Sequence, residues 1–133
     1  MTPFILQIIT PEGFLYDGEA ESVIVRTTVG DKGILARHEP YAAALGTGKV
    51  RVMSGGKQIV AALSSGLIKV SADKTVILAQ SCEWGDRIDT KRAEEAKRIA
   101  EEKLADTALN ANEHDVAEFK LRRALNRLDA AGK

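Results

Sequence analysis

The chain has 133 residues, of which 44% are hydrophobic and 29% are charged, a composition that excludes disorder, collagen and low-complexity repeats. Its length suffices for one main domain with a small appendage. Nineteen basic side chains balance nineteen acidic ones, so the net charge gives no reason to expect nucleic acid or an acidic membrane as the partner.

Cysteine content and hydropathy limit the compartment. Cys82 is the only cysteine, which excludes an internal disulfide and a cysteine-based zinc site and favours a reducing environment. The apolar stretch at residues 4–9 is interrupted by Gln7 and is far shorter than the roughly 20 residues of a membrane span. The first residues have neither a basic signal-peptide start nor an Arg- and Ser-rich transit helix. We therefore expect a protein that stays in the compartment where it is made.

Residues 1–84 have the pattern of short β-strands. Apolar positions alternate or run in short bursts, as in 22–26 and 66–70, between turn signals. Gly55-Gly56 and Ala72-Asp73 predict two hairpin turns. The segment that starts at Gly30-Asp31-Lys32-Gly33 lacks the spacing of a phosphate-binding loop and is predicted to be a turn. The strands follow one another without a helical period, so we expect an antiparallel sandwich or barrel of ~8–10 strands.

Residues 85–133 predict an antiparallel two-helix hairpin. Charged side chains number 16 in residues 1–83 and 22 in the shorter stretch 84–133. Asp89 is the expected N-cap of the first helix and Asn112 of the second, and Glu94 is placed to pair with Arg98. The predicted apolar stripes are Ala93, Ala96, Ala100 and Leu104, then Ala117, Leu121, Ala124, Leu125 and Leu128. Because alanine seams bury little apolar area, such a hairpin needs support from the β domain or from a partner.

Candidate chemical groups are few. His38 and His114 are the only histidines, and neither has neighbours at metal-ligand spacing or a plausible pairing with Cys82, so we expect no metal site and no catalytic centre. The loop 36–40 is a candidate binding loop. Between Phe119 and the C-terminus only Asp129 opposes five cations, which are Lys120, Arg122, Arg123, Arg127 and Lys133. This basic stretch suits an acidic protein surface, nucleotide phosphates or nucleic acid, and it also complements a helix dipole.

Several short motifs resemble one known family when they are taken together and in order. They are Ile9-Thr10-Pro11-Glu12-Gly13 with Asp17-Gly18-Glu19, Gly33-Ile34-Leu35 followed by His38 and Pro40, Ser65-Gly66-Leu67 before Val70, Val76-Ile77-Leu78-Ala79, and Ile88-Asp89-Thr90-Lys91-Arg92-Ala93. Over its full length the chain resembles the ε subunits of bacterial F-type ATP synthases, which are equivalent to the chloroplast ε chain. It departs from their usual pattern at Ala36-Arg37, where Pro-Gly or Pro-Asn is common, and at Ser65-Gly66, where Gly-Gly is common.

The resemblance implies a ten-stranded β-sandwich that docks on the γ subunit of the central stalk and on the c-ring, with the loop from Asp31 to His38 near the ring. It implies a mobile hairpin whose Arg122, Arg123 and Arg127 meet an acidic loop of β in the α/β catalytic head and block ATP hydrolysis. No cofactor is required, but ATP is implied as a regulatory ligand. The residues expected for ATP are Glu83, Ile88, Asp89, Arg92, Ala93, Arg123 and Arg127.

The same resemblance implies a non-catalytic subunit of a rotary complex at the cytoplasmic face of a bacterial membrane, with a plastid-encoded chain as the minor alternative. Three other functions remain open at this point. The chain could be an unrelated β-sandwich adaptor whose hairpin binds a coiled coil. Nucleic-acid binding through the basic helix lacks an aromatic platform, and an enzyme is the least favoured class.

Overall fold

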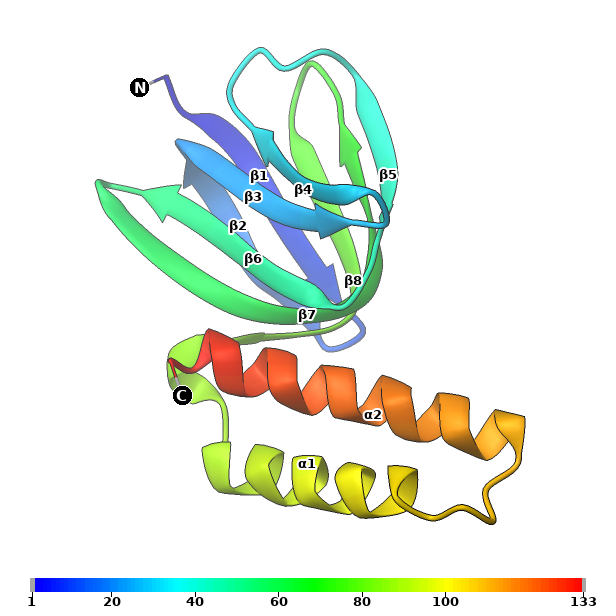
Figure 1. Ribbon diagram of the computed structural model, residues 1–133. Coiled ribbons are helices and arrows are strands. Elements are labelled where there is room, and N and C mark those ends of the chain that lie inside the picture. The colour runs from blue at the N-terminus through cyan, green and yellow to red at the C-terminus, as the bar shows by residue number, and fades with distance from the viewer. Residues whose placement is uncertain (1, 133) are drawn as a thin grey trace.

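The computed structural model describes residues 2–132 and contains a β-sandwich followed by a helical hairpin that packs beneath one end of it (Figure 1). The strands are β1 (Phe4–Thr10), β2 (Gly13–Ala20), β3 (Ser22–Thr27), β4 (Gly30–Ile34), β5 (Tyr41–Leu45), β6 (Gly48–Ser54), β7 (Lys57–Val70) and β8 (Thr75–Trp84). A short 3₁₀ turn, η1 (Gly85–Arg87), leads to α1 (Thr90–Leu104) and α2 (Ala111–Ala130). The predicted fold class, an antiparallel sandwich followed by a two-helix hairpin, is confirmed.

The eight strands form one continuous, folded sheet in the order β2-β1-β8-β7-β5-β3-β4, and β6 joins β3 to β7. Strand β7 links the two layers, because its first half pairs with β6 and its second half pairs with β5. β8 pairs with β7 along most of this length. A long strand that changes partner in this way is how a sheet turns a corner and closes around a core.

Two details differ from the sequence expectation. Eight strands are present in residues 2–132, two fewer than the family resemblance implies. β7 continues through Ser65, where a positive φ interrupts its register with β8, and this continuous strand accounts for one of the two. The pair β1–β8 is parallel, whereas the other pairs in this part of the chain are antiparallel. No hairpin joins these two strands, so the packing of the layers decides their relative direction.

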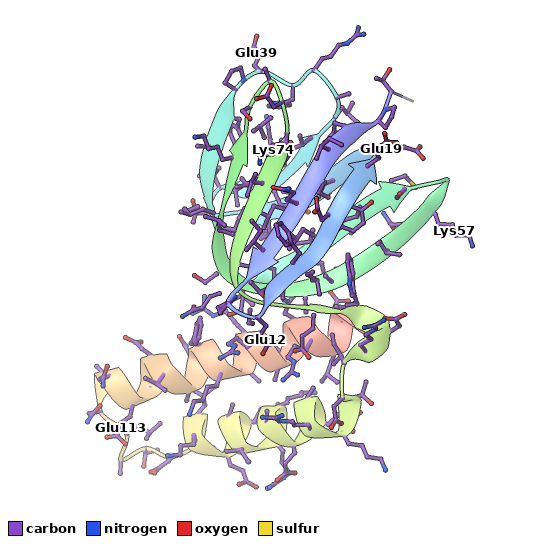
Figure 2. All side chains as sticks on the ribbon, turned by 180° about the vertical axis from the view of Figure 1, so that it is seen from behind. Glu12, Glu19, Glu39, Lys57, Lys74 and Glu113 are labelled. Carbon is purple, nitrogen blue, oxygen red and sulfur yellow. The ribbon has the colours of Figure 1, made fainter. Side chains whose placement is uncertain are left out.

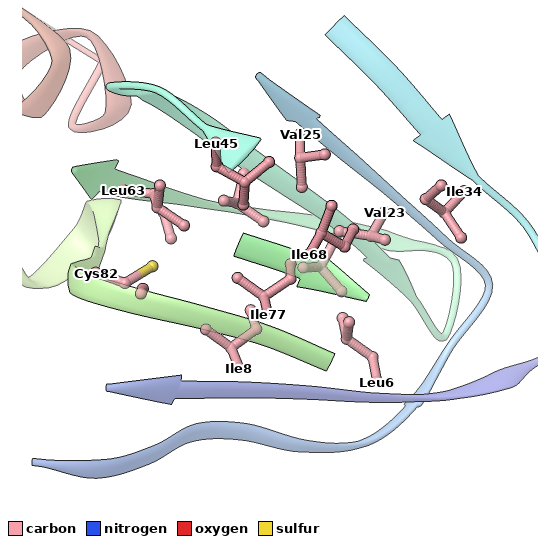
Figure 3. Packing of buried hydrophobic residues seen from close by; sticks show 14 of the residues in the cluster. Leu6, Ile8, Val23, Val25, Ile34, Leu45, Leu63, Ile68, Ile77 and Cys82 are labelled. Carbon is pink, nitrogen blue, oxygen red and sulfur yellow. The ribbon is translucent and has the colours of Figure 1, made fainter. Parts of the chain in front are cut away.

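The core lies between the layers and is aliphatic (Figure 3). Leu6, Ile8, Val23, Val25 and Ile77 have no exposed surface, and their positions follow the period of two that the sequence shows. Among the described residues no helix is long and apolar enough to cross a membrane.

The predicted hairpin turns are mostly confirmed. Gly55 and Gly56 have φ of 60° and 75°, the left-handed values that a two-residue turn of this kind requires. The Ser71 amide donates to the Lys74 carbonyl oxygen at 3.0 Å around the second turn. The turn predicted from Gly30 to Gly33 is wrong, because these residues lie in β4, paired with β3. The chain reverses just before them, at Thr28 and Val29.

One of the two predicted helix N-caps is confirmed and the other is wrong. Asp89 caps α1, since its side chain accepts from the Arg92 amide at 3.1 Å. The cap of α2 is Asn110 and not Asn112, because the Asn110 side chain accepts from the Glu113 amide at 2.8 Å. Asn110 with glutamate three residues later is the better capping pattern.

Two expected features of the hairpin surface are wrong. Arg98 does not pair with Glu94. It forms ion pairs with Glu95 and with Glu102, the latter at 2.5 Å. Leu125, expected in the seam between the helices, is 44% exposed, whereas the buried seam residues are Ala93, Ala100, Ala117, Ala124 and Leu128.

Candidate functional site

The hairpin contacts the sandwich mainly through the C-terminal end of α2. This helix packs on β6 and β7, while α1 packs mainly against α2. The Asn126 side-chain amide donates to the carbonyl oxygens of Gly48 at 3.0 Å and Leu63 at 3.2 Å. Two ion pairs flank this contact, Lys49–Asp129 at 3.0 Å and Arg127–Glu83 at 2.8 Å.

Gly85 lets the end of α2 lie against the chain that leaves the sandwich. A Cβ atom added at Gly85 would lie 2.1 Å from the carbonyl oxygen of Ala130, a separation that backbone atoms cannot tolerate. These anchoring contacts fall within residues 126–130, and the N-terminal half of α2 reaches beyond the sandwich (Figure 1).

A groove of about 490 Å³ runs between the two helices. Its walls are apolar where Ala96, Ile99, Ala100, Val116, Ala117 and Ala124 line it. Its charged residues are five cations, Arg92, Lys103, Lys120, Arg123 and Arg127, and one acid, Glu113. An apolar floor with a cationic rim suits a ligand that has a flat apolar part and phosphate groups.

The groove brings together some of the residues expected for ATP. Arg92, Arg123 and Arg127 line it, and Glu83 reaches it through its ion pair with Arg127. The Nε atom of Arg127 is buried and has no hydrogen-bond partner among the described residues. An unpaired buried donor of a cation carries an energetic penalty that an anionic ligand would relieve.

The other residues expected for ATP have structural roles and do not line the groove. Ile88 and Ala93 are buried. Asp89 caps α1, as described above. Lys103 and Lys120 line the groove but were not among the expected ATP residues. The sequence feature that could have identified these two lysines is their position directly before Leu104 and Leu121, which belong to the two apolar stripes.

The remaining cations of the basic stretch are distributed around α2. Arg122 is exposed and does not line the groove, whereas the Arg123 guanidinium lies 5.7 Å from the centroid of the Phe119 ring. Lys133 lies outside the described residues. The three arginines expected to meet an acidic partner thus do not share one face in this hairpin position, because Arg123 and Arg127 line the groove and Arg122 does not. Arg127 is in addition paired with Glu83.

Asp31 and His38, which were expected to contact a common partner, have separate surroundings. Asp31 lies in β4 and forms ion pairs with Arg26 at 2.5 Å and with Arg51 at 3.4 Å. The hydrogen bond from Arg26 is the main reason that the pKa of Asp31 lies below its ordinary value. His38 lies in the loop before β5, beside Tyr41, with 5.8 Å between ring centroids. Glu39 and Lys74 mark this end of the sandwich, which points away from the helices (Figure 2).

An apolar row crosses the outer face of the sandwich. The register places Phe14 beside Ile9, Ile9 beside Leu78, Leu78 beside Leu67, and Leu67 beside Ala44. Paired residues on neighbouring strands point to the same face. Phe14, Leu67 and Leu78 are 60%, 55% and 49% exposed. Exposed apolar side chains gathered in one row are typical of a protein-binding surface, and no short motif in the sequence revealed them.

Two further groups carry no chemistry that we can assign. Cys82 is a buried thiol whose pKa burial raises to about 12, so it is a poor nucleophile. His114, Asp115 and Glu118 place ligand atoms within 4.8 Å of one another, but all three side chains are exposed. Clusters of this kind are common on solvated helix faces.

The comparisons with known proteins cover nearly the whole chain. Residues 3–85 match the family model "ATP synthase, Delta/Epsilon chain, beta-sandwich domain", and residues 86–132 match "ATP synthase, Delta/Epsilon chain, long alpha-helix domain". A relative from Ruminococcus albus named ATP synthase epsilon chain is 42% identical, over 100% of this chain and 99% of its own length. One from Bacillus pumilus with the same name is 44% identical over 96% of each chain.

Solved structures agree on the fold. A chain in the cryo-EM structure of the Euglena gracilis mitochondrial ATP synthase, described as OSCP/F1/c-ring in rotational state 1, superposes with a TM-score of 0.85 at 23% identity, covering 100% of this chain and 83% of that one. Because the two domain models together cover residues 3–132 and both relatives are more than 40% identical, the chain belongs to the ATP synthase delta/epsilon chain family.

Proposed function

We propose that this protein is the epsilon subunit of an F-type ATP synthase, a non-catalytic part of the rotating central stalk that couples γ to the c-ring in proton-driven ATP synthesis. The observation that carries the proposal is the 42% identity to an ATP synthase epsilon chain over essentially the full length of both chains. Membership of this family replaces the alternative of an unrelated coiled-coil adaptor. We place the protein at the cytoplasmic face of a bacterial membrane, attached through the complex.

The sandwich is the anchor in this proposal. The apolar row from Phe14 to Ala44 is the surface that we assign to γ, because exposed apolar side chains on a rigid sheet are suited to a stable interface. The c-ring is assigned to the end of the sandwich that carries His38. The ion pairs of Asp31 tie β4 to β3 and β6 next to the turn at Thr28 and Val29, which is the opposite end of β4 from the loop that carries His38.

The hairpin is the regulatory element. Its seam is mostly alanine and its contacts with the sandwich are confined to one end of α2, so a modest free energy separates the docked hairpin from a released one. A released hairpin would free Arg127 to join Arg122 and Arg123 against an acidic loop of the β subunit and so inhibit ATP hydrolysis. Charge-assisted bonds between guanidinium and carboxylate groups suit that contact.

ATP is the regulatory ligand that the groove fits best. Arg92, Arg123 and Arg127 surround a space with apolar walls, so the phosphates would meet cations while the base lies on alanine and isoleucine side chains. A ligand that bridges the two helices would stabilise the folded hairpin and so relieve inhibition.

Removal of residues 85–133 tests the inhibitory role. The remaining sandwich should still co-purify with γ and the catalytic head, and ATP hydrolysis by the assembled head should rise. The matched full-length variant Arg122→Ala/Arg123→Ala should reproduce much of that rise without removing any helix. Normal co-purification with unchanged hydrolysis in both cases would reject the inhibitory role, and failure to co-purify with γ would reject the stalk assignment itself.

Calorimetric titration of the isolated full chain with ATP tests the ligand. We expect saturable heat that is lost in Arg92→Ala and kept in Lys91→Ala, an exposed neighbour that does not line the groove. Absence of heat at millimolar ATP would exclude ATP as the regulator and leave the stalk assignment unaffected.

A further inference from the structure

We infer that Asn126 is the positioning residue that latches the hairpin onto the sandwich, through an amide group that bonds two strand carbonyls at once. The inference rests on the proposed role of the hairpin as a switch. It adds the contact that holds the docked state and a way to open it.

The geometry requires two donors at one point. Gly48 and Leu63 are register partners at the end of the β6–β7 ladder, just before β7 leaves β6 and pairs with β5 from Gly66 onward. Their carbonyl oxygens converge on the Nδ2 atom of Asn126, at 3.0 and 3.2 Å. A primary amide has two N–H groups on one nitrogen, so asparagine can satisfy both acceptors. Aspartate offers none and serine offers one.

The neighbouring contacts are less suited to define the docked position. In the Lys49–Asp129 pair the two side chains are 31% and 64% exposed. In the Arg127–Glu83 pair they are 23% and 42% exposed. Each pair has one carboxylate that is well exposed to water, which screens the attraction and lets the pair form in several geometries. The Asn126 bonds are partly buried and directional, and breaking them leaves two backbone acceptors to be solvated again.

Asn126 lies where the hairpin is attached to the sandwich. The polar contacts with the sandwich lie within residues 126–129, whereas the rest of α2 packs mainly against α1. Loss of the Asn126 bonds therefore loosens the whole hairpin at its main attachment, without disturbing the aliphatic core between the layers.

The test is amide hydrogen exchange on the isolated full chain without nucleotide, comparing Asn126→Asp, Asn126→Ala and the control Asn112→Asp. The control makes the same change in charge at an exposed position of the same helix. Position 112 lies in the first turn of α2, where the helix dipole favours a carboxylate, whereas position 126 lies near the C-terminal end, so the uncharged Asn126→Ala must also accelerate exchange for the latch to hold. In Asn126→Asp a carboxylate faces two carbonyl oxygens, so the α2 amides around residues 121–128 should exchange at least about tenfold faster. Asn126→Ala should give a smaller increase and Asn112→Asp none, while core amides such as Ile68 and Ile77 keep their protection in all three.

The latch would be overturned if α2 exchange in either Asn126 variant stayed within about twofold of the unchanged chain, or if Asn112→Asp accelerated it equally. ATP hydrolysis by catalytic heads assembled with each variant separates the latch from the proposed function. Faster exchange with stronger inhibition supports both. Faster exchange with unchanged hydrolysis supports the latch and rejects the inhibitory role of the hairpin.

Discussion

Arg37 and Ser65 are the only described residues other than glycine with a positive φ, and both have a φ of 61°. They are also the two places where the sequence departs from the family's usual glycine or asparagine. For a residue with a Cβ this conformation costs roughly 1–2 kcal/mol. The family resemblance thus identifies the two positions at which glycine or asparagine has been replaced. Only the structure shows that the backbone at both positions keeps the left-handed conformation and is therefore strained.

Ser65→Gly should therefore stabilise the protein by about 1 kcal/mol, because glycine adopts this conformation without strain. Urea unfolding of the full chain measures the change. Ser81→Gly, in the paired strand β8, is the control and should lower stability, since glycine weakens an ordinary strand position. Equal destabilisation by the two substitutions would show that Ser65 is unstrained.

Cys82 gives the fold a pH dependence of its own. Burial raises its pKa from an ordinary value of 9.0 to about 12, so the folded state holds the thiol proton more tightly than the unfolded chain does. The resulting stabilisation is complete below about pH 9 and is lost as the pH rises toward 12. Urea midpoints at about pH 8 and pH 10.5 for the unchanged chain and for Cys82→Ala should therefore converge at the higher pH. A constant difference between the two proteins would contradict this linkage.

At the scale of elements, periodicity predicted both helices and the strand character of the first 84 residues, because each pattern is local and follows from the side-chain spacing of the element itself. The start of α2 shows where local patterns become ambiguous. Two asparagines lie two residues apart, and only the glutamate at position 113 singles out Asn110 as the cap. Arg98 shows the same ambiguity, since it has acidic residues at four possible helical spacings, three and four residues away on either side, and bonds two of them.

Asn110→Ala should cost about 1 kcal/mol of local helix stability, because the Glu113 amide loses its acceptor. Hydrogen exchange at the amides of residues 111–114 should accelerate by a corresponding factor. Asn112→Ala is the matched control, with the same change two residues later on an exposed face, and should leave these amides unchanged. If Asn112→Ala had the larger effect, the assignment of the cap would be wrong.

At the scale of the whole molecule, the features that carry function join residues that are distant in sequence. Asn126 bonds carbonyl oxygens 78 and 63 residues away, and the parallel β1–β8 pair joins the first strand to the last. Neither contact produces a pattern within a short stretch of sequence. The sequence therefore predicted that the hairpin needs support, but not which residues attach it to the sandwich. The apolar row has the same origin, because it becomes a surface only when five strands align.

The apolar row makes a final prediction about assembly. A glutamate at Leu67 would place a charge near the middle of the row, where Leu67 lies between Leu78 and Ala44. Leu67 is 55% exposed, so Leu67→Glu should leave the melting temperature of the isolated chain nearly unchanged. In an interface core, however, the same charge would lose its water, and the affinity for γ should fall at least about tenfold.

Ile59→Glu, also on β7 and 39% exposed but outside the row, is the control and should bind γ normally. Equal binding by both variants, measured by co-purification and by titration with the γ subunit, would remove this face from the interface and direct the search to the end of the sandwich that carries His38.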